Sequence, residues 1–538
     1  MREDSRDSSG VGYVGPVPAI PRLLERGCRA GALALLLVGG AAGTLPAQAL
    51  PAQERGEVID LTLERMVDLA LSSSYRVRQL NLSIERTQHR LRAEQARLKS
   101  RVSMDMTLPA FNATSEPRWN STLQKNEIVY ENSRRWEGEL SIRQPVILFG
   151  YPTNGYLSFN NRMYRYTTVE DDGQKDVNYY NRYYLRYVQP LFQPNSLRND
   201  LEEAQLDLED AELEFFGDVV GIVDDLSDDY FELFGDAYSR VINEGLVRNL
   251  ERALLVAQEL AGADSSRAME EGQVRVELAN AREQLQQSEA AYRLRSAYLK
   301  TRLGLPETDS LALDPVLSLE PVEIDVADAV QYAMELTPRL RQLNISYREN
   351  EISLDNTRGR NSFRMDLSFS YGREMYEPEF QRLWEEPENS YTVNVDAYLP
   401  IWDWGERNAR VAASRISLEQ THLRIEEAET QIVSNVRNEV LNVREYEART
   451  LAMQENLELA REISQTSIER YRMGSIPVID LLQSFRRQTD TANNFLDAYL
   501  GWRGALLSLQ EMTFYDFEED MPVLERFGVA TSGLNPDR

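Results

Sequence analysis

Two stretches of the chain repeat their hydrophobic positions at helical spacing over unusual lengths. They cover roughly residues 196–261 and 407–473. In the second stretch a narrow hydrophobic seam returns every seven residues, at Val411, Leu418, Ile425 and Ile432. A seam of this period is typical of a coiled coil. Because an α-helix rises about 1.5 Å per residue, each stretch predicts a helix about 100 Å long, well beyond an ordinary globular helix.

Each long helix is followed by a shorter helical pattern, which predicts two helical hairpins. The second hairpin covers residues 406–513, with its tip at Gly474, Ser475, Ile476 and Pro477. Gly474 suits the left-handed position that ends a helix, and Pro477 suits the first turn of the next one. The first hairpin is predicted at residues 196–304. Two positions, Gly262 and Gly272, are candidates for its tip.

Shorter stretches alternate polar and apolar residues with a period of two, which predicts strands. The strand regions are residues 101–109, 136–192, 362–372 and 390–400. Tyrosine and tryptophan gather near their ends, as in the aromatic girdles of membrane strands. Four strands are clear. A further pair of strand-like runs within residues 136–166 has no counterpart in the second half, and either adds strands to the sheet or stands outside it.

The chain contains an internal duplication, in which one structural unit occurs twice. Arg76–Ser83 returns as Arg339–Ser346 with six of eight positions identical, and each copy is followed by strands and a long hairpin. The predicted organisation is therefore a first repeat at 50–314, a second repeat at 315–513 and a C-terminal tail at 514–538, which the resemblance described below would place in the periplasm.

The N-terminus has the layout of a secretory signal peptide, predicted at residues 1–49. Three arginines precede an apolar run at residues 30–42, and Ala47-Gln48-Ala49 offers a small-residue cleavage site. The single cysteine, Cys28, lies inside this segment. The exported chain is therefore expected to hold together by burial, without disulfides.

The net charge and the hydropathy of the chain indicate which of two partners, nucleic acid and membrane, it can bind and how. A net charge of −28 argues against binding nucleic acid through its phosphates. No stretch after the signal peptide approaches the roughly eighteen apolar residues of a transmembrane helix, so membrane entry would have to use strands. Four strands cannot close a barrel, since about eight are needed, and open sheet edges are not tolerated in lipid. Several chains would therefore each lend strands to one barrel.

Five short motifs, in this order, resemble the TolC-like outer-membrane efflux protein family over essentially the whole exported chain. They are Leu61-Thr62-Leu63-Glu64 with Leu69-Ala70-Leu71, Gln189-Pro190-Leu191-Phe192, Leu303-Gly304-Leu305-Pro306, Leu399-Pro400-Ile401-Trp402-Asp403, and Tyr471 followed by Gly474 and Asp480.

The resemblance implies a mainly α fold with a membrane β-barrel. Three chains would share a twelve-stranded barrel in the cell outer membrane, and their long α-helical hairpins would continue it as a tunnel through the periplasm. It also implies a homotrimer that contacts outer-membrane lipid and serves a tripartite efflux pump or a type I secretion system. The partners would be a periplasmic adaptor (membrane fusion) protein and an inner-membrane transporter of RND, ABC or MFS type.

The resemblance further implies a channel gate at the periplasmic mouth. Asp480 matches the first of a pair of family aspartates, and Gln483 stands at the second position. A ring of acids there would favour cations and trap multivalent ones. The alternative is that Asp480 only interacts favourably with the first turn of its helix.

Tyr471 matches a tyrosine that locks the closed mouth by bonding to the other hairpin; its alternative role is a packed coiled-coil aromatic. Ile476 replaces an arginine that joins this lock in some members. Glu277 is the candidate for a facing acid on the first hairpin. The tip, Gly474 to Pro477, is the expected adaptor contact.

The sequence contains few candidate catalytic residues. The two histidines, His89 and His422, lie in charged helical contexts, and there is no Cys/His metal spacing and no phosphate-binding glycine loop. We therefore expect no enzyme activity, no cofactor and no metal site. Besides the channel, a periplasmic coiled-coil scaffold or an adaptor without a pore remains an alternative function.

Overall fold

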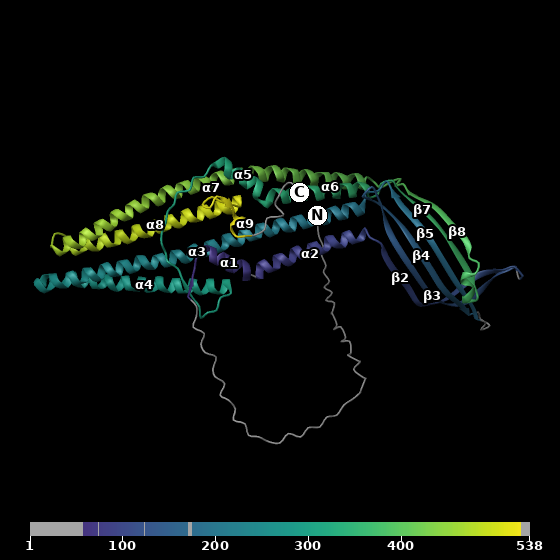
Figure 1. Cartoon of the computed structure of the whole chain (residues 1–538), viewed down its shortest axis with the longest axis horizontal. Helices are drawn as coiled ribbons and strands as arrows, with labels where there is room; N and C mark the ends of the chain where they lie inside the picture. The colour runs from purple at the N-terminus through teal and green to yellow at the C-terminus, as the bar shows by residue number, and fades with distance from the viewer. Residues whose placement is uncertain (1–57, 74, 123, 170–174, 529–538) are drawn as a thin grey trace, which may run out of the picture. The chain divides into compact units, whose positions relative to one another are not determined.

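The computed structural model describes residues 58–73, 75–122, 124–169 and 175–528, all within one unit, Arg55–Arg538. The predicted signal peptide lies outside the described residues. The described part combines long helices with one large antiparallel sheet (Figure 1).

Both predicted long helices are confirmed. The first hairpin consists of α3 (Ser196–Ala263) and α4 (Ala268–Leu303), and the second of α7 (Glu406–Arg472) and α8 (Val478–Thr513). The turn of the first hairpin lies at Asp264, next to the first of its two candidate positions. The side chain of Asp264 accepts a hydrogen bond from the amide of Ser266 at 3.0 Å. Gly262 therefore lies in the last turn of α3, and Gly272 lies inside α4.

Shorter elements pack along these hairpins. Helix α2 lies against α3, and α6 lies against α7. The bounds are α1 (Leu63–Ser73), α2 (Tyr75–Arg97), α5 (Val326–Leu336), α6 (Pro338–Gly359) and α9 (Val523–Arg526), with short turns of 3₁₀-helix at η1 (Ser265–Arg267) and η2 (Phe380–Trp384). Two small two-stranded sheets pair β1 (Val58–Asp60) with β6 (Ser310–Ala312), and β9 (Tyr515–Asp516) with β10 (Met521–Pro522). No helix of the described ranges is both long and apolar enough to cross a membrane.

The large sheet has six strands, in the order β2-β3-β4-β5-β7-β8. They are β2 (Arg101–Asn120), β3 (Lys125–Leu148), β4 (Tyr151–Val169), β5 (Lys175–Leu191), β7 (Arg364–Glu377) and β8 (Glu388–Tyr398). Of the two alternatives for the runs within residues 136–166, the structure shows the first: they belong to β3 and β4, between β2 and β5, and they raise the strand number from the four clear strands to six. Strand β2 also continues well past residue 109, because the register shift between Thr107 and Ala110 interrupts its alternation without ending the pairing.

The two faces of this sheet differ along its whole width. One row of cross-strand neighbours is apolar and exposed on all six strands: Val102, Ile142, Phe159, Leu185, Tyr371 and Tyr391. The adjacent row is made of small or polar residues: Ser103, Ser141, Asn160, Tyr184, Gly372 and Ser390. Since successive side chains of a strand point to opposite faces, one face is apolar and the other polar.

The polar face is tied together by side chains from neighbouring strands. Tyr164 stacks on Tyr180 with ring centroids 4.6 Å apart. The Tyr180 hydroxyl donates to Glu374 at 2.8 Å, and Glu374 also pairs with Arg182 at 3.6 Å. These contacts join half-buried polar side chains of neighbouring strands to one another.

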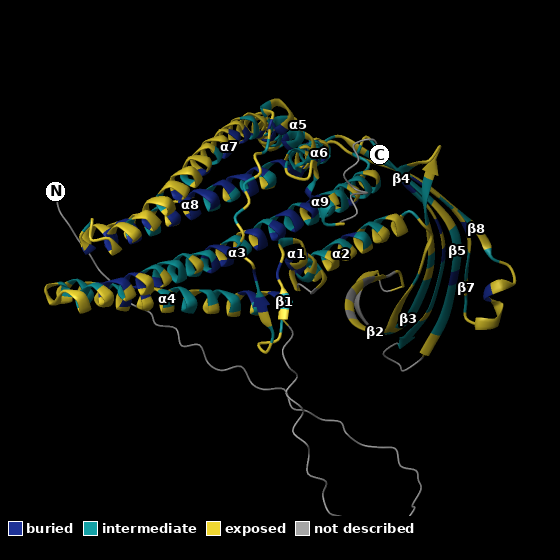
Figure 2. Ribbon diagram, turned by 60° about the vertical axis from the view of Figure 1, so that its left-hand side comes forward, coloured by how far each residue is buried: buried dark blue, intermediate teal, exposed yellow. Residues whose placement is uncertain are grey.

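The helices bury their apolar residues on the faces that meet one another, and the outer faces are exposed (Figure 2). One core lies where α3 and α8 pack with α1 and α5, around Trp502, Leu233 and Met66. A second core lies at the hairpin tips, around Tyr471 and Phe485. The two hairpins are therefore held together at two levels by hydrophobic burial.

Candidate gate at the hairpin tips

The tip core brings all four hairpin helices together. Leu250 of α3 and Val274 of α4 pack with Tyr471 of α7 and Leu481 and Phe485 of α8, and each of these side chains is almost fully buried. The tips of the two hairpins are thus one packed unit within a single chain. Any outward movement of one tip must separate this core.

The turn between α7 and α8 follows from its glycine. Gly474 has a φ of 69°, a left-handed conformation that glycine adopts without strain. The amide of Ser475 then donates back to the carbonyl of Arg470 at 2.8 Å, which satisfies a free carbonyl of the helix end. Pro477 lies one position earlier than predicted, as the residue before α8, and its carbonyl accepts from the amide of Asp480 at 3.2 Å.

Tyr471 connects the second hairpin to the first. Its ring is buried in the tip core, and its hydroxyl donates to a carboxylate oxygen of Glu270 on α4 at 3.0 Å. Burial and the neighbouring Glu270 carboxylate both raise the pKa of the Tyr471 hydroxyl, so it stays protonated and remains a donor. One side chain thus combines a packed aromatic ring with a hydrogen bond to the other hairpin.

Glu277 makes a second connection between the hairpins. Its two carboxylate oxygens accept from the Nε and an Nη of Arg486 on α8 at 2.9 and 3.0 Å. This two-pronged arrangement is the strong geometry of an arginine–carboxylate pair. The carboxylate also raises the pKa of the Arg486 guanidinium.

Asp480 and Gln483 lie on a different side of α8. Both are exposed and line a groove of about 640 Å³ between α7 and α8, together with Arg487 and Asp490. Glu277 and Arg486 line a neighbouring groove, formed by α3, α4 and α8, which shares only Asp490 with the first. Within one chain, therefore, the structure joins Tyr471 and Glu277 to the opposite hairpin but does not bring Glu277 next to Asp480.

The tip residues expected to contact an adaptor are accessible. Gly474, Ser475 and Pro477 are exposed, whereas Ile476 is half-buried against the tip core. Ile476 thus contributes apolar packing where some family members carry a charge.

Two residues of this site escaped the sequence analysis: Glu270 and Arg486. Glu270 lies seven residues before Glu277, so both occupy one face of α4, and that spacing was a usable signal. Arg486 carried no comparable signal, because its partner is 209 residues away along the chain.

Two long helical hairpins attached to a sheet of antiparallel strands define a class of solved proteins, the outer-membrane channels. The chain matches the channel CmeC of Campylobacter jejuni with 13% identity and a TM-score of 0.61, covering 93% of this chain and 98% of that one. It matches VceC of Vibrio cholerae with 12% identity and a TM-score of 0.61, over 84% and 95% of the two chains. The open state of the MtrE channel of Neisseria gonorrhoeae matches with 13% identity and a TM-score of 0.55, over 84% and 88%.

In sequence, residues 350–513 match the family model described as outer membrane efflux protein. No curated protein matches the chain significantly in sequence. The resemblance predicted from the motifs is confirmed: the chain is similar to the TolC-like outer-membrane efflux proteins, in fold over most of its length and in sequence over its second hairpin.

Proposed function

We propose that this chain forms the exit duct of a tripartite efflux pump or a type I secretion system in the outer membrane of a Gram-negative-type cell. Its sheet would sit in the membrane and its helical hairpins would extend into the periplasm. The observation that carries this proposal is the six-stranded sheet with one continuous apolar, exposed face and one polar face. Such a sheet suits a wall between lipid and water.

The unpaired edges of the sheet support a barrel to which several copies of the chain contribute strands. Within the described residues, β2 and β8 each pair on one side only. An unpaired edge leaves backbone donors and acceptors unsatisfied, which lipid does not tolerate. The edge strand β8 of one copy would therefore pair with β2 of the next, and a homotrimer closes the circle.

The number of strands per chain sets the size of such a barrel. Three copies of six strands give eighteen strands, instead of the twelve expected from the resemblance. Barrels of about sixteen to eighteen strands leave an aqueous channel, and the diameter grows with strand number. The hairpin formed by β3 and β4 would thus widen the membrane part of the duct. Deleting it should lower the single-channel conductance of an opened channel.

The gate would lie at the hairpin tips, where Tyr471–Glu270 and Glu277–Arg486 hold the two hairpins together. Binding of a periplasmic adaptor at Gly474 to Pro477 would draw the tips apart and break these contacts. An inner-membrane transporter would then pass its cargo into the duct. Three copies of Asp480 around the axis would give the mouth its preference for cations.

Planar-bilayer recordings of the purified full chain test the gate. Asp480→Ala should weaken block by multivalent cations, because it removes the proposed ring of charge. Asp497→Ala, which removes another exposed acid of α8, should leave the block unchanged. If Asp480→Ala also leaves it unchanged, Asp480 is not at the constriction. If neither the wild-type chain nor Tyr471→Phe, which removes a contact that holds the tips together, conducts any current, the duct itself is refuted.

A further inference from the structure

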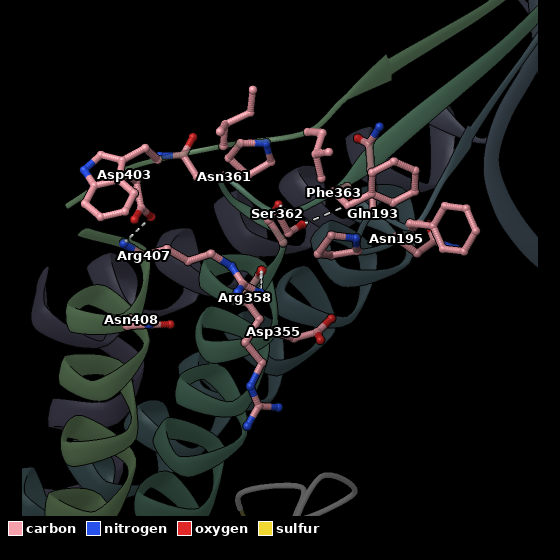
Figure 3. A pocket seen from close by; sticks show the side chains of 17 residues that line it. Gln193, Asn195, Asp355, Arg358, Asn361, Ser362, Phe363, Asp403, Arg407 and Asn408 are labelled. Atoms are coloured by element: carbon pink, nitrogen blue, oxygen red, sulfur yellow. Dashed lines mark hydrogen bonds between the residues drawn. The ribbon is translucent and has the colours of Figure 1, made fainter. Parts of the chain in front are cut away.

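A pocket of about 900 Å³ lies where the strands meet the helices, remote from the hairpin tips (Figure 3). Its wall combines three segments: residues 192–195 after β5, residues 355–363 at the end of α6, and residues 399–408 leading into α7. None of these segments takes part in the proposed gate.

The rim of this pocket is apolar and exposed. Ile401 is 90% exposed, Trp402 74% and Phe192 67%. Leu399 is exposed too, and it continues the alternation that places Val393 and Val395 on the apolar face of the sheet. The rim is therefore a prolongation of that face toward the helices.

Two aromatic residues at this junction have an uncommon backbone conformation. Phe192 has a φ of 62°, and Trp404, whose ring contacts Trp402 edge-on at 5.5 Å, has a φ of 53°. Bulky residues rarely adopt positive φ, and such strain concentrates at binding sites. Here it holds large apolar side chains in the open, which is favourable only if an apolar medium covers them.

The pocket also carries charges without ion-pair partners. Asp355 and Arg358 are exposed on the same face of α6, and neither forms an ion pair with another described residue. An Nη of Arg407 donates to the carbonyl of Arg358 at 3.2 Å, and its buried Nε has no hydrogen-bond partner within the described part of the chain. Asp403 is occupied, because its two carboxylate oxygens accept from the amides of Gly405 at 3.0 Å and Arg407 at 3.1 Å. The pocket thus offers two cations and one free carboxylate.

We infer that this pocket binds the headgroup of a primary-amine, zwitterionic phospholipid at the membrane surface. Arg358 and Arg407 contact the phosphate, for which guanidinium groups are suited. Asp355 accepts hydrogen bonds from the ammonium group. The acyl chains lie against the rim, where tryptophan is favoured between lipid and water. This inference rests on the proposed function, which places the sheet in the outer membrane.

The arrangement favours a lipid over other occupants. A free phosphate ion would meet the arginines but leave Ile401 and Trp402 in water. A second copy of the chain would cover the apolar rim, but its packing would have to pair three charges. A phosphate and an ammonium carried next to one another, with hydrocarbon attached, meet both requirements.

Native mass spectrometry of the detergent-purified full chain, with added dioleoylphosphatidylethanolamine or dioleoylphosphatidylcholine, tests this site. The wild type should retain more phosphatidylethanolamine, because the choline nitrogen has no N–H to donate to Asp355. Arg358→Gln should reduce retention of both lipids about tenfold, as expected for one charged hydrogen bond. Asp355→Ala, which leaves no acceptor for the ammonium group, should remove the preference between them, so it reports on the site even if the arginine variant folds poorly.

Arg410→Gln provides the matched control. Arg410 lies one turn further along α7, pairs with Glu406 at 2.7 Å and does not line the pocket. Equal retention in the wild type, Arg358→Gln and Arg410→Gln would overturn the inference. So would a photo-crosslinker at position 402 that joins two chains instead of a chain and a lipid. Membrane fractionation and conductance of the same wild-type preparation test the proposed function separately.

Discussion

At the residue scale, Tyr471 shows why a buried tyrosine often serves two purposes. Its ring fills the tip core, and its hydroxyl reaches the carboxylate of Glu270 on the opposite hairpin. The tyrosine was singled out by the motif. The partner was not, because a contact between residues 201 positions apart leaves no trace in local periodicity.

Tyr471→Phe should keep the packing and lose the hydrogen bond. Because the bond is part-buried and its acceptor is charged, we expect a loss of about 1–3 kcal/mol in the free energy holding the tips together. In bilayer recordings this appears as a higher open probability without adaptor. Tyr298→Phe is the control, since Tyr298 is exposed on α4. Equal open probability in both variants and the wild type would contradict a lock at Tyr471.

Asp224 on α3 is a second residue whose environment matters. Burial first, and then the carboxylates of Glu511, Asp228 and Asp225, raise the pKa of Asp224 to about 7. An acid with a raised pKa in the folded chain holds a proton that the unfolded chain has already released. Asp224 therefore contributes stability that is fully present below about pH 4, near its ordinary pKa of 3.8, and is lost as pH rises through about 7.

Thermal unfolding of the purified chain between pH 5 and pH 8 tests this. The melting temperature should be higher at the acidic end, and Asp224→Asn should flatten that dependence, because asparagine is neutral at every pH. Asp497→Asn, an exposed site on α8, should retain the wild-type slope. An unchanged slope in Asp224→Asn would show that Asp224 is already ionised across this range.

At the element scale, the hairpin formed by α7 and α8 depends on one close approach. A Cβ atom on Gly501 of α8 would come within 2.5 Å of the ring of Tyr446 on α7, whereas a Cβ on Gly504 would meet nothing within 4 Å. Gly501 thus lets the two helices pack around Tyr446, and Gly504 has no such role.

Gly501→Ala should destabilise the chain by about 1–3 kcal/mol, because the aromatic ring must move out of its packed position. Gly504→Ala, one turn along the same helix, should stabilise it by up to about 1 kcal/mol through the higher helix propensity of alanine. Thermal or denaturant unfolding of both variants measures the difference. A gain of stability in Gly501→Ala would mean that α7 and α8 are not packed this closely.

The elements were unevenly predictable from the sequence. The long helices were predicted because their hydrophobic residues recur at helical spacing along most of their length. The turn between α3 and α4 was narrowed to two candidates, at Gly262 and at Gly272, and the structure shows it next to the first, where Asp264 caps it instead of a glycine. Strands β3 and β4 were noticed but not placed: their polar faces carry Glu137, Arg162 and Tyr164, whose partners lie on neighbouring strands.

At the scale of the whole molecule, the proposed duct depends on the sheet. A single chain leaves two strand edges unpaired within the described residues and exposes an apolar row that crosses all six strands. In the proposed trimer, pairing of β8 of one copy with β2 of the next would remove the edges, and lipid would cover the apolar row. The helical hairpins of the three copies would then form one duct, closed where their tips meet.

The mass of the full chain after extraction from membranes tests this most directly. Light scattering or native mass spectrometry, corrected for bound detergent, should give three copies of the chain, and the assembly should stay in solution only with detergent. A single subunit that is recovered without detergent and remains stable in water would contradict a shared barrel, and with it the exit duct.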